Sequence, residues 1–184
     1  MHTITNSIVN MERLNKNTWL LEGFKVIESD GFARITVENL CERLQRSKGS
    51  FYFHFHNMDG YVQALMDFWL EENTLSIIRR ADATKGKDKR QVLYQLSVSQ
   101  SLKLEQYIRA WGFSNETVRM MVQKADNLRL ESIVAVEVSD GKNSTEAKDV
   151  ATLTYAALVG MQQLFPNMPK KEKLRLEQLF SSKF

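Results

Sequence analysis

Residues 36–55 read TVENLCERLQRSKGSFYFHF, and this stretch divides into two short helices with a turn at residues 44–47 between them. Thr36 and Ser47 stand directly before the two helices. Both residue types favour that position, because their side-chain oxygen accepts a hydrogen bond from a free backbone N–H. The stretch therefore predicts a helix-turn-helix unit. The apolar residues that share one face of its first helix are Val37, Leu40, Cys41 and Leu44.

The second helix, residues 48–55, has two faces of different character. At about 100° per residue, Phe51 and Phe55 fall together on an inner face, whereas Phe53 falls on the opposite side. The outer face suits a DNA duplex, because glycine permits close approach and polar side chains donate to phosphates or base edges. From the spacing alone a second interpretation is equally open, in which Phe53 packs on the N-terminal segment of an ordinary helical hairpin. The small and polar residues around Phe53 are Lys48, Gly49, Ser50, Tyr52 and His54.

Composition restricts the class of protein. The chain has 184 residues, of which 43% are apolar and 26% charged, and its net charge of +3 permits a nucleic-acid partner without requiring one. The single cysteine, Cys41, excludes a disulfide framework and a cysteine-based zinc cluster, and it fits a reducing cytosol. No apolar run approaches the ~18 residues that span a bilayer, and residues 1–18 lack the pattern of a secretory signal. We therefore expect a cytoplasmic protein with no membrane partner.

The rest of the chain also shows helical periodicity, and its first 165 residues contain no proline. Residues 79–90 carry six basic and two acidic side chains, from which we expect an exposed loop. The predicted fold class is all-α, with a compact N-terminal unit of about three short helices followed by a larger helical body. The further helices are expected over residues 15–29, 61–80, 93–111, 114–140 (capped by Ser114), 146–165 and 170–183.

Residues 19–62 resemble the DNA-binding domain of the tetracycline-repressor (TetR) family. The resemblance implies an all-helical homodimer with an N-terminal helix-turn-helix DNA-binding domain, residues 11–61, and a helical ligand-binding and dimerisation domain, residues 62–184. The matching N-terminal residues are Gly31-Phe32, Thr36, Leu40-Cys41, Leu44, the run from Ser47 to Phe55, and Asp59. Those that resemble the ligand-binding body of the family are Ile108 to Trp111, Asp126, Arg129-Leu130, Glu146-Ala147 and Tyr155 to Gly160.

The resemblance also implies a set of DNA contacts. By matching position, Thr36 corresponds to the phosphate contact that the family makes at the start of the helix before the turn. We add Arg46 and Ser47 from the turn to this predicted DNA-binding site. The residues that correspond to contacts of the recognition helix are Lys48, Gly49, Ser50, Tyr52, Phe53 and His54.

Three features depart from the family pattern. Gln45 replaces a favoured turn glycine, and a left-handed backbone there would cost a residue with a side chain about 1 kcal/mol. Met58 stands where the family usually has a phosphate-binding lysine. Residues 1–60 hold seven basic and seven acidic side chains, which predicts modest or unusually salt-sensitive DNA affinity. The local cations that compensate are Arg34, Arg43 and Arg46.

A stripe of helical spacing from Leu93 to Trp111 contains two polar residues, Gln100 and Tyr107. The favoured interpretation is a hydrogen bond in the core or an interface contact. The alternative is an apolar ligand pocket, in which these two groups orient a small molecule and its occupancy moves two DNA-binding units off the ~34 Å spacing of two half-sites. The other candidate ligand residues are Trp69 or Trp111 as walls and Met120 or Met121 as lining.

Small residues recur along the predicted helix at residues 146–165. They suit close helix packing, either in the core of one chain or across a dimer seam, and the family resemblance favours the seam. These residues are Ala147, Ala151, Ala157 and Gly160.

Three functions follow, in order of preference. The first is a ligand-responsive, DNA-binding transcriptional repressor that binds a palindromic operator as a homodimer and is released by a small molecule. The second is a helical dimer that has lost operator binding and acts through ligand or protein contacts, which Met58 and the neutral N-terminal charge favour. The third is a small all-α enzyme. It is disfavoured because the sequence has no glycine-rich phosphate loop and no nucleophile–base pair, and His54 and His56 point ~200° apart on a helix. We expect no enzyme activity, cofactor or metal, and as partners double-stranded DNA, a second copy and a small-molecule effector.

Overall fold

The computed structural model describes residues 15–84, 88–97 and 101–181, and every regular element in these ranges is helical. This confirms the predicted all-α class. No helix in the described ranges is both long and apolar enough to cross a membrane. The elements are α1 (Lys16–Asp30), the 3-10 helix η1 (Phe32–Arg34), α2 (Val37–Leu44), α3 (Lys48–Phe55), α4 (Met58–Leu70), the π-helical turn η2 (Glu71–Leu75), α5 (Ser76–Asp82), α6 (Asp88–Ser97), α7 (Leu102–Gly112), α8 (Glu116–Ser139), α9 (Ser144–Leu164) and α10 (Lys170–Ser181).

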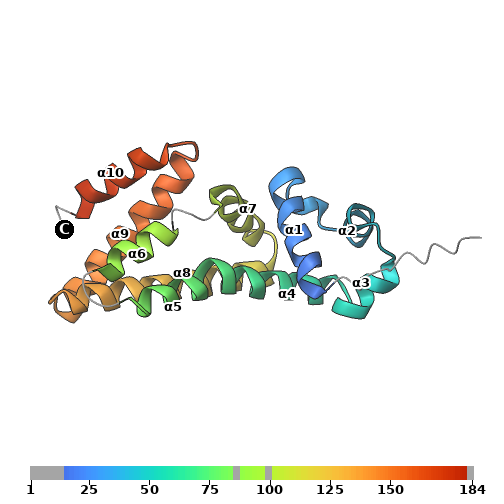
Figure 1. Cartoon of the computed structure of the whole chain (residues 1–184), viewed down its shortest axis with the longest axis horizontal. Helices are drawn as coiled ribbons and strands as arrows, with labels where there is room; N and C mark the ends of the chain where they lie inside the picture. The colour runs from blue at the N-terminus through green and yellow to red at the C-terminus, as the bar shows by residue number, and fades with distance from the viewer. Residues whose placement is uncertain (1–14, 85–87, 98–100, 182–184) are drawn as a thin grey trace, which may run out of the picture.

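The helices form an elongated molecule (Figure 1). Helices α1–α3, which we call the head, lie at one end, and α9 and α10 lie at the other. Helices α4–α10 form the body, in which α8 packs against α4, α7 and α9. The helix-turn-helix unit is therefore placed at a tip of the molecule, away from the C-terminal helices.

Both predicted caps of the helix-turn-helix unit are confirmed. Thr36 Oγ1 accepts a hydrogen bond from the backbone N–H of Asn39 at 3.2 Å, and Ser47 Oγ accepts from that of Ser50 at 3.3 Å. Gln45 ends α2 in the left-handed conformation, with φ 53° and ψ 48°. The turn therefore has the glycine-type backbone that the family resemblance implied, but with a side chain on it.

An aromatic cluster holds α3 against α1 and α4. Phe51 and Phe55 are buried, as predicted, and the ring of Phe51 meets Trp19 edge-on with centroids 5.6 Å apart. The Tyr61 hydroxyl donates to the backbone oxygen of Trp19 at 2.9 Å. Gly23 makes room for this bond, because a Cβ at that position would lie 2.1 Å from the hydroxyl oxygen. The cluster fixes which face of α3 points inward and leaves the opposite face at the surface.

Helices α4 and α5 continue each other through η2, so the predicted helix at residues 61–80 exists but begins three residues earlier and contains a π turn. A π turn adds one residue to a helical turn and disturbs the regular bonding of its carbonyls. Arg129 of α8 bonds to this turn, since its guanidinium donates to Thr74 Oγ1 at 3.1 Å and to the Asn73 carbonyl at 3.3 Å. The π turn is thus fixed to the longest helix of the body.

A second group of buried polar bonds connects α7, α8 and α9. Arg109 donates to the two carboxylate oxygens of Asp126 at 3.0 and 2.6 Å, and the Tyr155 hydroxyl donates to Asp126 at 2.6 Å. Arg129 donates to Glu105 at 2.9 Å and lies over the ring of Trp69, 5.4 Å from its centroid. Burial raises the pKa of Tyr155 to about 12, so its hydroxyl stays protonated and keeps donating at neutral pH. These bonds form one network, the Arg109–Arg129 network.

The predicted exposed loop at residues 79–90 is wrong at both ends, where the chain is helical. Two of its cations pair with carboxylates. Arg79 pairs with Glu71, eight residues earlier, and Arg90 pairs with Glu137, a fully buried residue near the end of α8. Both ends of the segment are therefore helical and hold ion pairs, whereas residues 85–87 lie outside the described residues.

The predicted continuous helix from Leu93 to Trp111 is also wrong, because α6 ends at Ser97 and α7 begins at Leu102. Ser101 has an extended backbone, and its hydroxyl accepts from the backbone N–H of Leu104 at 3.2 Å. A serine in this capping role starts a new helix and ends the regular stripe. Gln100, one of the predicted ligand residues, lies outside the described residues.

The cap of α8 is Asn115, so the prediction of Ser114 is wrong by one position. The Asn115 side chain accepts from the backbone N–H of Val118 at 3.1 Å. Ser114 instead belongs to the turn after α7, where its hydroxyl donates to the carbonyl of Trp111 at 3.2 Å. Both residue types favour caps, and the geometry of this turn selects the asparagine.

The small residues of α9 divide into two groups. Ala147 and Ala151 are fully buried within the single chain, so a dimer seam is the wrong prediction for them, and they belong to the core that α9 shares with the rest of the body. At Gly160, by contrast, an added Cβ would have no other atom of the described chain within 4 Å.

Replacing Gln45 with glycine should raise the free energy of unfolding by up to about 1 kcal/mol, because a left-handed backbone strains any residue with a Cβ. Urea denaturation followed by circular dichroism measures this change. The control is Glu42→Gly in the regular part of α2, which should lower the free energy of unfolding by about 1 kcal/mol. A Gln45→Gly variant that is less stable than the wild type would contradict the prediction.

Replacing Tyr155 with phenylalanine should lower the free energy of unfolding by about 1–3 kcal/mol, because it removes a donor from the partly buried carboxylate of Asp126. Tyr107→Phe is the control, since the hydroxyl of Tyr107 lies outside the Arg109–Arg129 network, and it should change stability by less than about 0.5 kcal/mol. Equal effects of the two substitutions would argue against the network.

The same network predicts a dependence on pH. Burial alone would raise the pKa of Asp126, but the hydrogen bonds from Arg109 and Tyr155 lower it below its ordinary value of 3.8. The ionised carboxylate therefore adds stability that is present above this value and is lost as the pH falls through the lower folded-state pKa. Unfolding curves between pH 6 and pH 3 should show a smaller acid-induced loss of stability for Asp126→Asn than for the wild type.

Candidate nucleic-acid interface

The outer face of α3 is exposed at the tip of the head (Figure 1). Phe53 has 71% and Tyr52 has 46% of its surface accessible, which is unusual for large aromatic side chains. Lys48 and Gly49 at the start of the helix are also exposed, whereas Ser50 and His54 are half-buried at its edges. The structure thus brings the predicted recognition-helix residues together on one surface.

Among the residues that the structure describes, nothing requires glycine at position 49. Its φ is ordinary, and the one described neighbour of a Cβ built there would be the Ser47 hydroxyl oxygen, at a normal contact distance of 3.7 Å. A small residue at an exposed helix start permits close approach by a partner, where backbone N–H groups favour an anion. This position therefore fits a phosphate or a base edge that approaches α3 from outside.

Thr36 lies exposed at the start of α2, beside the start of α3. Its hydroxyl oxygen is occupied as the cap of α2, but its hydroxyl hydrogen can still donate to a phosphate oxygen. Of the turn residues, Ser47 is exposed and Arg46 is half-buried. The predicted DNA-binding residues thus all belong to the helix-turn-helix unit at the tip of the molecule.

An ion pair that the sequence does not predict connects the two helices of this unit. Lys48 Nζ donates to Glu38 Oε1, and both side chains are mostly exposed. The hydrogen bond from Lys48 lowers the pKa of Glu38, and the same bond raises the pKa of Lys48. Both groups are therefore charged at neutral pH, and the pair as a whole is neutral. The only signal in the sequence is that each residue lies in the first turn of its helix.

Other charges of the head also pair internally. Arg43 donates to Glu22 at 2.7 Å and to Asp30 at 3.0 Å, and Lys25 pairs with Glu22 at 3.1 Å. Arg43 is thus held by the acidic residues of α1 and is a poor replacement for a missing phosphate contact. Residues 1–60 have no net charge, and several of their charged side chains are also paired individually with an opposite charge.

Met58 is the first residue of α4 and packs half-buried against the core. Asn57 caps this helix by accepting from the backbone N–H of Gly60 at 2.7 Å. The position where the family usually has a phosphate-binding lysine is therefore an apolar anchor of α4. The loss of one phosphate contact of the family pattern stays a prediction.

Four predicted ligand residues lie in or against one core. Trp69, Trp111 and Met121 are buried, and Tyr107 packs half-buried against them. Trp111 stacks on Phe32 of η1 with centroids 5.8 Å apart, so one of these residues also links the body to the head. Their role in binding a ligand stays a prediction.

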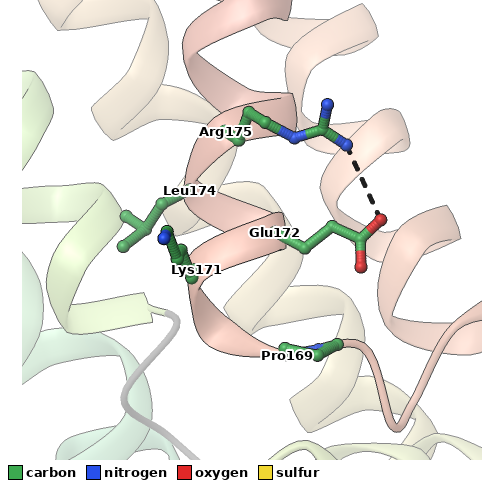
Figure 2. A pocket seen from close by; sticks show the side chains of 5 residues that line it. All are labelled: Pro169, Lys171, Glu172, Leu174 and Arg175. Carbon is green, nitrogen blue, oxygen red and sulfur yellow. Dashed lines mark ion pairs between the residues drawn. The ribbon is translucent and has the colours of Figure 1, made fainter.

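A shallow groove lies elsewhere, beside α10 (Figure 2). Glu172 and Arg175 form an ion pair on one side of the helix, 3.7 Å apart, while Leu174 points to the other side. The predicted ligand residues are absent from its lining, which consists of Pro169, Lys171, Glu172, Leu174 and Arg175. Across the part of the chain that the structure describes, no group of three His, Cys, Asp or Glu side chains could hold a metal ion.

Comparisons with known proteins agree with this geometry. Residues 20–65 match the family described as "Bacterial regulatory proteins, tetR family". The fold is similar to that of a TetR transcriptional regulator from Legionella pneumophila, with a TM-score of 0.78 at 12% identity over 93% of this chain and 97% of that chain. A sequence comparison with curated proteins finds no match. Residues 20–65 therefore belong to the TetR family of DNA-binding transcription regulators, and the chain as a whole has the fold of such a regulator.

Proposed function

We propose that this protein is a repressor that binds a palindromic operator as a homodimer and leaves it when a small molecule binds the body. The observation that carries the proposal is the exposed outer face of α3, set on an inner aromatic core at the tip of the molecule. Tyr52 and Phe53 expose ring surface next to small and polar side chains on this face, a combination that suits contact with a duplex. Repression follows from occupying a promoter.

Each residue of the surface has a role in this proposal. Tyr52 and His54 donate to phosphate oxygens at the edges of α3, and Phe53 contacts a thymine methyl or a sugar. Ser50 contacts a base edge or a phosphate, and Gly49 permits the close approach of the duplex. The remaining contacts come from α2 and the turn: Thr36, Arg46, Ser47 and Lys48.

The homodimer is proposed to form through the far end of the body. Leu153 and Leu164 of α9 are 53% and 74% exposed in the single chain, and Val138 of α8 is also exposed. A second copy that covers these side chains would gain hydrophobic stabilisation, and Gly160 would permit close helix approach. Because α9 lies far from α3, pairing there leaves both heads free for two half-sites. The proposed DNA-binding domain spans residues 11–61, and the proposed ligand-binding and dimerisation domain spans residues 62–184.

Release by a small molecule is proposed to pass through α7. This helix packs against α1 and η1 of the head. The contacts include the Trp111–Phe32 stack and a hydrogen bond from Ser101, the cap of α7, to Glu28. It also carries Tyr107, one of the predicted ligand residues, and Trp69 and Met121 lie in the same core. A ligand that displaces α7 would therefore shift the head relative to the body.

One set of observations favours the second function, a helical dimer that has lost operator binding. The apolar Met58 and the neutral Glu38–Lys48 pair both remove charge from a surface that would meet phosphates. A protein with few phosphate contacts binds DNA weakly and with a shallow dependence on salt.

Selection of bound duplexes from a random pool tests the proposal. A repressor of this type should enrich a two-fold symmetric consensus, because each head contacts one half-site. The affinity for the selected duplex should also fall steeply as salt rises from 50 to 200 mM. Failure to enrich any sequence at low salt, with a flat and weak salt titration, would favour the second function.

Tyr52→Phe should weaken binding to all duplexes by a similar factor, because it removes a phosphate contact that carries no sequence information. Fluorescence anisotropy with the selected duplex and a scrambled duplex measures both affinities. Tyr107→Phe in the body serves as the control and should leave both unchanged. A change in the ratio of the two affinities would show that Tyr52 contacts a base.

Leu153→Lys should convert the dimer to a monomer, because a lysine in the covered surface would be buried without a partner. Light scattering coupled to size-exclusion chromatography measures the mass. Leu21→Lys is a matched control, since Leu21 is 50% exposed on α1 of the head, and it should leave the mass unchanged. A Leu153→Lys variant that is still dimeric would place the seam elsewhere.

A further inference from the structure

The Glu38–Lys48 pair connects the first turn of α2 to the first residue of α3. Tyr52 and Phe53 lie further along the exposed face of α3. The side chains are 67% and 58% exposed, so the pair lies on the surface rather than in the packing between the helices. Exposed ion pairs contribute little to stability. The contacts that hold α3 in place are the aromatic ones around Phe51, so the fold gives no structural need for this pair.

The charge of the pair decides which part of a duplex it suits. A phosphate that approaches the Lys48 ammonium also meets the Glu38 carboxylate, whose negative charge repels it. A base edge is uncharged and presents donors as well as acceptors. The neutral pair, with N–H donors on one member and acceptor oxygens on the other, is therefore better matched to a base edge than to a phosphate.

A G·C pair fits this arrangement best. In the major groove it presents two acceptors, guanine O6 and N7, beside one donor, cytosine N4. The Lys48 ammonium donates one N–H to Glu38 and has two more for the guanine, while a carboxylate oxygen of Glu38 accepts from the cytosine. An A·T pair matches less well in either orientation. With adenine toward the lysine, the thymine O4 acceptor replaces the cytosine donor, and with thymine toward the lysine, O4 is a single acceptor for the two N–H groups.

We infer that Glu38 and Lys48 together read one G·C pair in each half-site, with the guanine on the side of Lys48. This inference rests on the proposed operator binding and adds Glu38, a residue outside the predicted DNA-binding set, as a determinant of specificity. Lys48 then reads a base rather than a phosphate. The hydrogen bond that lowers the pKa of Glu38 also keeps its acceptor oxygens ionised at neutral pH.

The test repeats the random-pool selection with the full-length wild type, Glu38→Ala and Glu42→Ala. Glu42 is an exposed carboxylate on the same helix, so its substitution changes the net charge equally and leaves Lys48 paired. The wild type and Glu42→Ala should both prefer G·C at one symmetric position by about tenfold or more. Glu38→Ala should reduce that preference to less than about threefold and leave the other positions unchanged.

Two outcomes would overturn the inference without affecting the proposed function. In one, the wild type enriches a symmetric consensus that has no such G·C position. In the other, Glu38→Ala raises affinity for every duplex by the same factor and keeps the consensus, so that Glu38 acts only as a repelling charge. Absence of any enrichment by the wild type would instead contradict operator binding itself.

Lys48→Ala gives an independent measurement. If Lys48 reads guanine within a neutral pair, this substitution should lose the G·C preference while the slope of log affinity against log salt changes little. A phosphate contact would instead reduce the slope by about 0.9 and leave the consensus intact, which would overturn the inference. Circular dichroism of each variant checks that the head stays helical.

Discussion

The packing of Phe51 and Phe55 against Trp19 and Tyr61 orients the helix-turn-helix unit, and the exposed surface follows from it. Because Phe51 and Phe55 are buried, the opposite side of this eight-residue helix faces outward. The Tyr61 hydroxyl then fixes α4 to α1 through a backbone carbonyl, in space that Gly23 leaves open. The position of α3 is thus determined by buried contacts and not by the polar residues that would meet a partner.

The head and the body share one hydrophobic core, and α4 and α7 are the body helices that contact the head. Tyr61 belongs to α4, and Trp111, which stacks on Phe32, belongs to α7. Within the body, Arg129 holds the π turn that follows α4 and joins it to α7 through Glu105. Arg129 of α8 thus bonds both to the π turn after α4 and to α7, and α4 and α7 both contact the head. A displacement of α8 would therefore affect both connections to the head.

Local chemistry made much of the fold predictable from the sequence. The caps at Thr36 and Ser47 and the inner face of α3 depend on neighbouring residues and helical spacing, and both predictions are confirmed. Some of the wrong predictions depend on partners far away in sequence. Arg90 pairs with Glu137 of α8 instead of facing only solvent, and no local pattern indicates this pair. The Glu38–Lys48 pair likewise requires the angle between two helices, which periodicity does not give.

The internal pairing of charges in the head has a consequence for how the protein would find its target. Residues 1–60 have no net charge, so outside its specific contacts the head attracts DNA only weakly. A genome offers roughly a million or more competing sites, and a strongly basic head would stay bound to them for much of the time. A neutral head instead dissociates quickly from such sites, so less of the protein would be held away from its proposed operator.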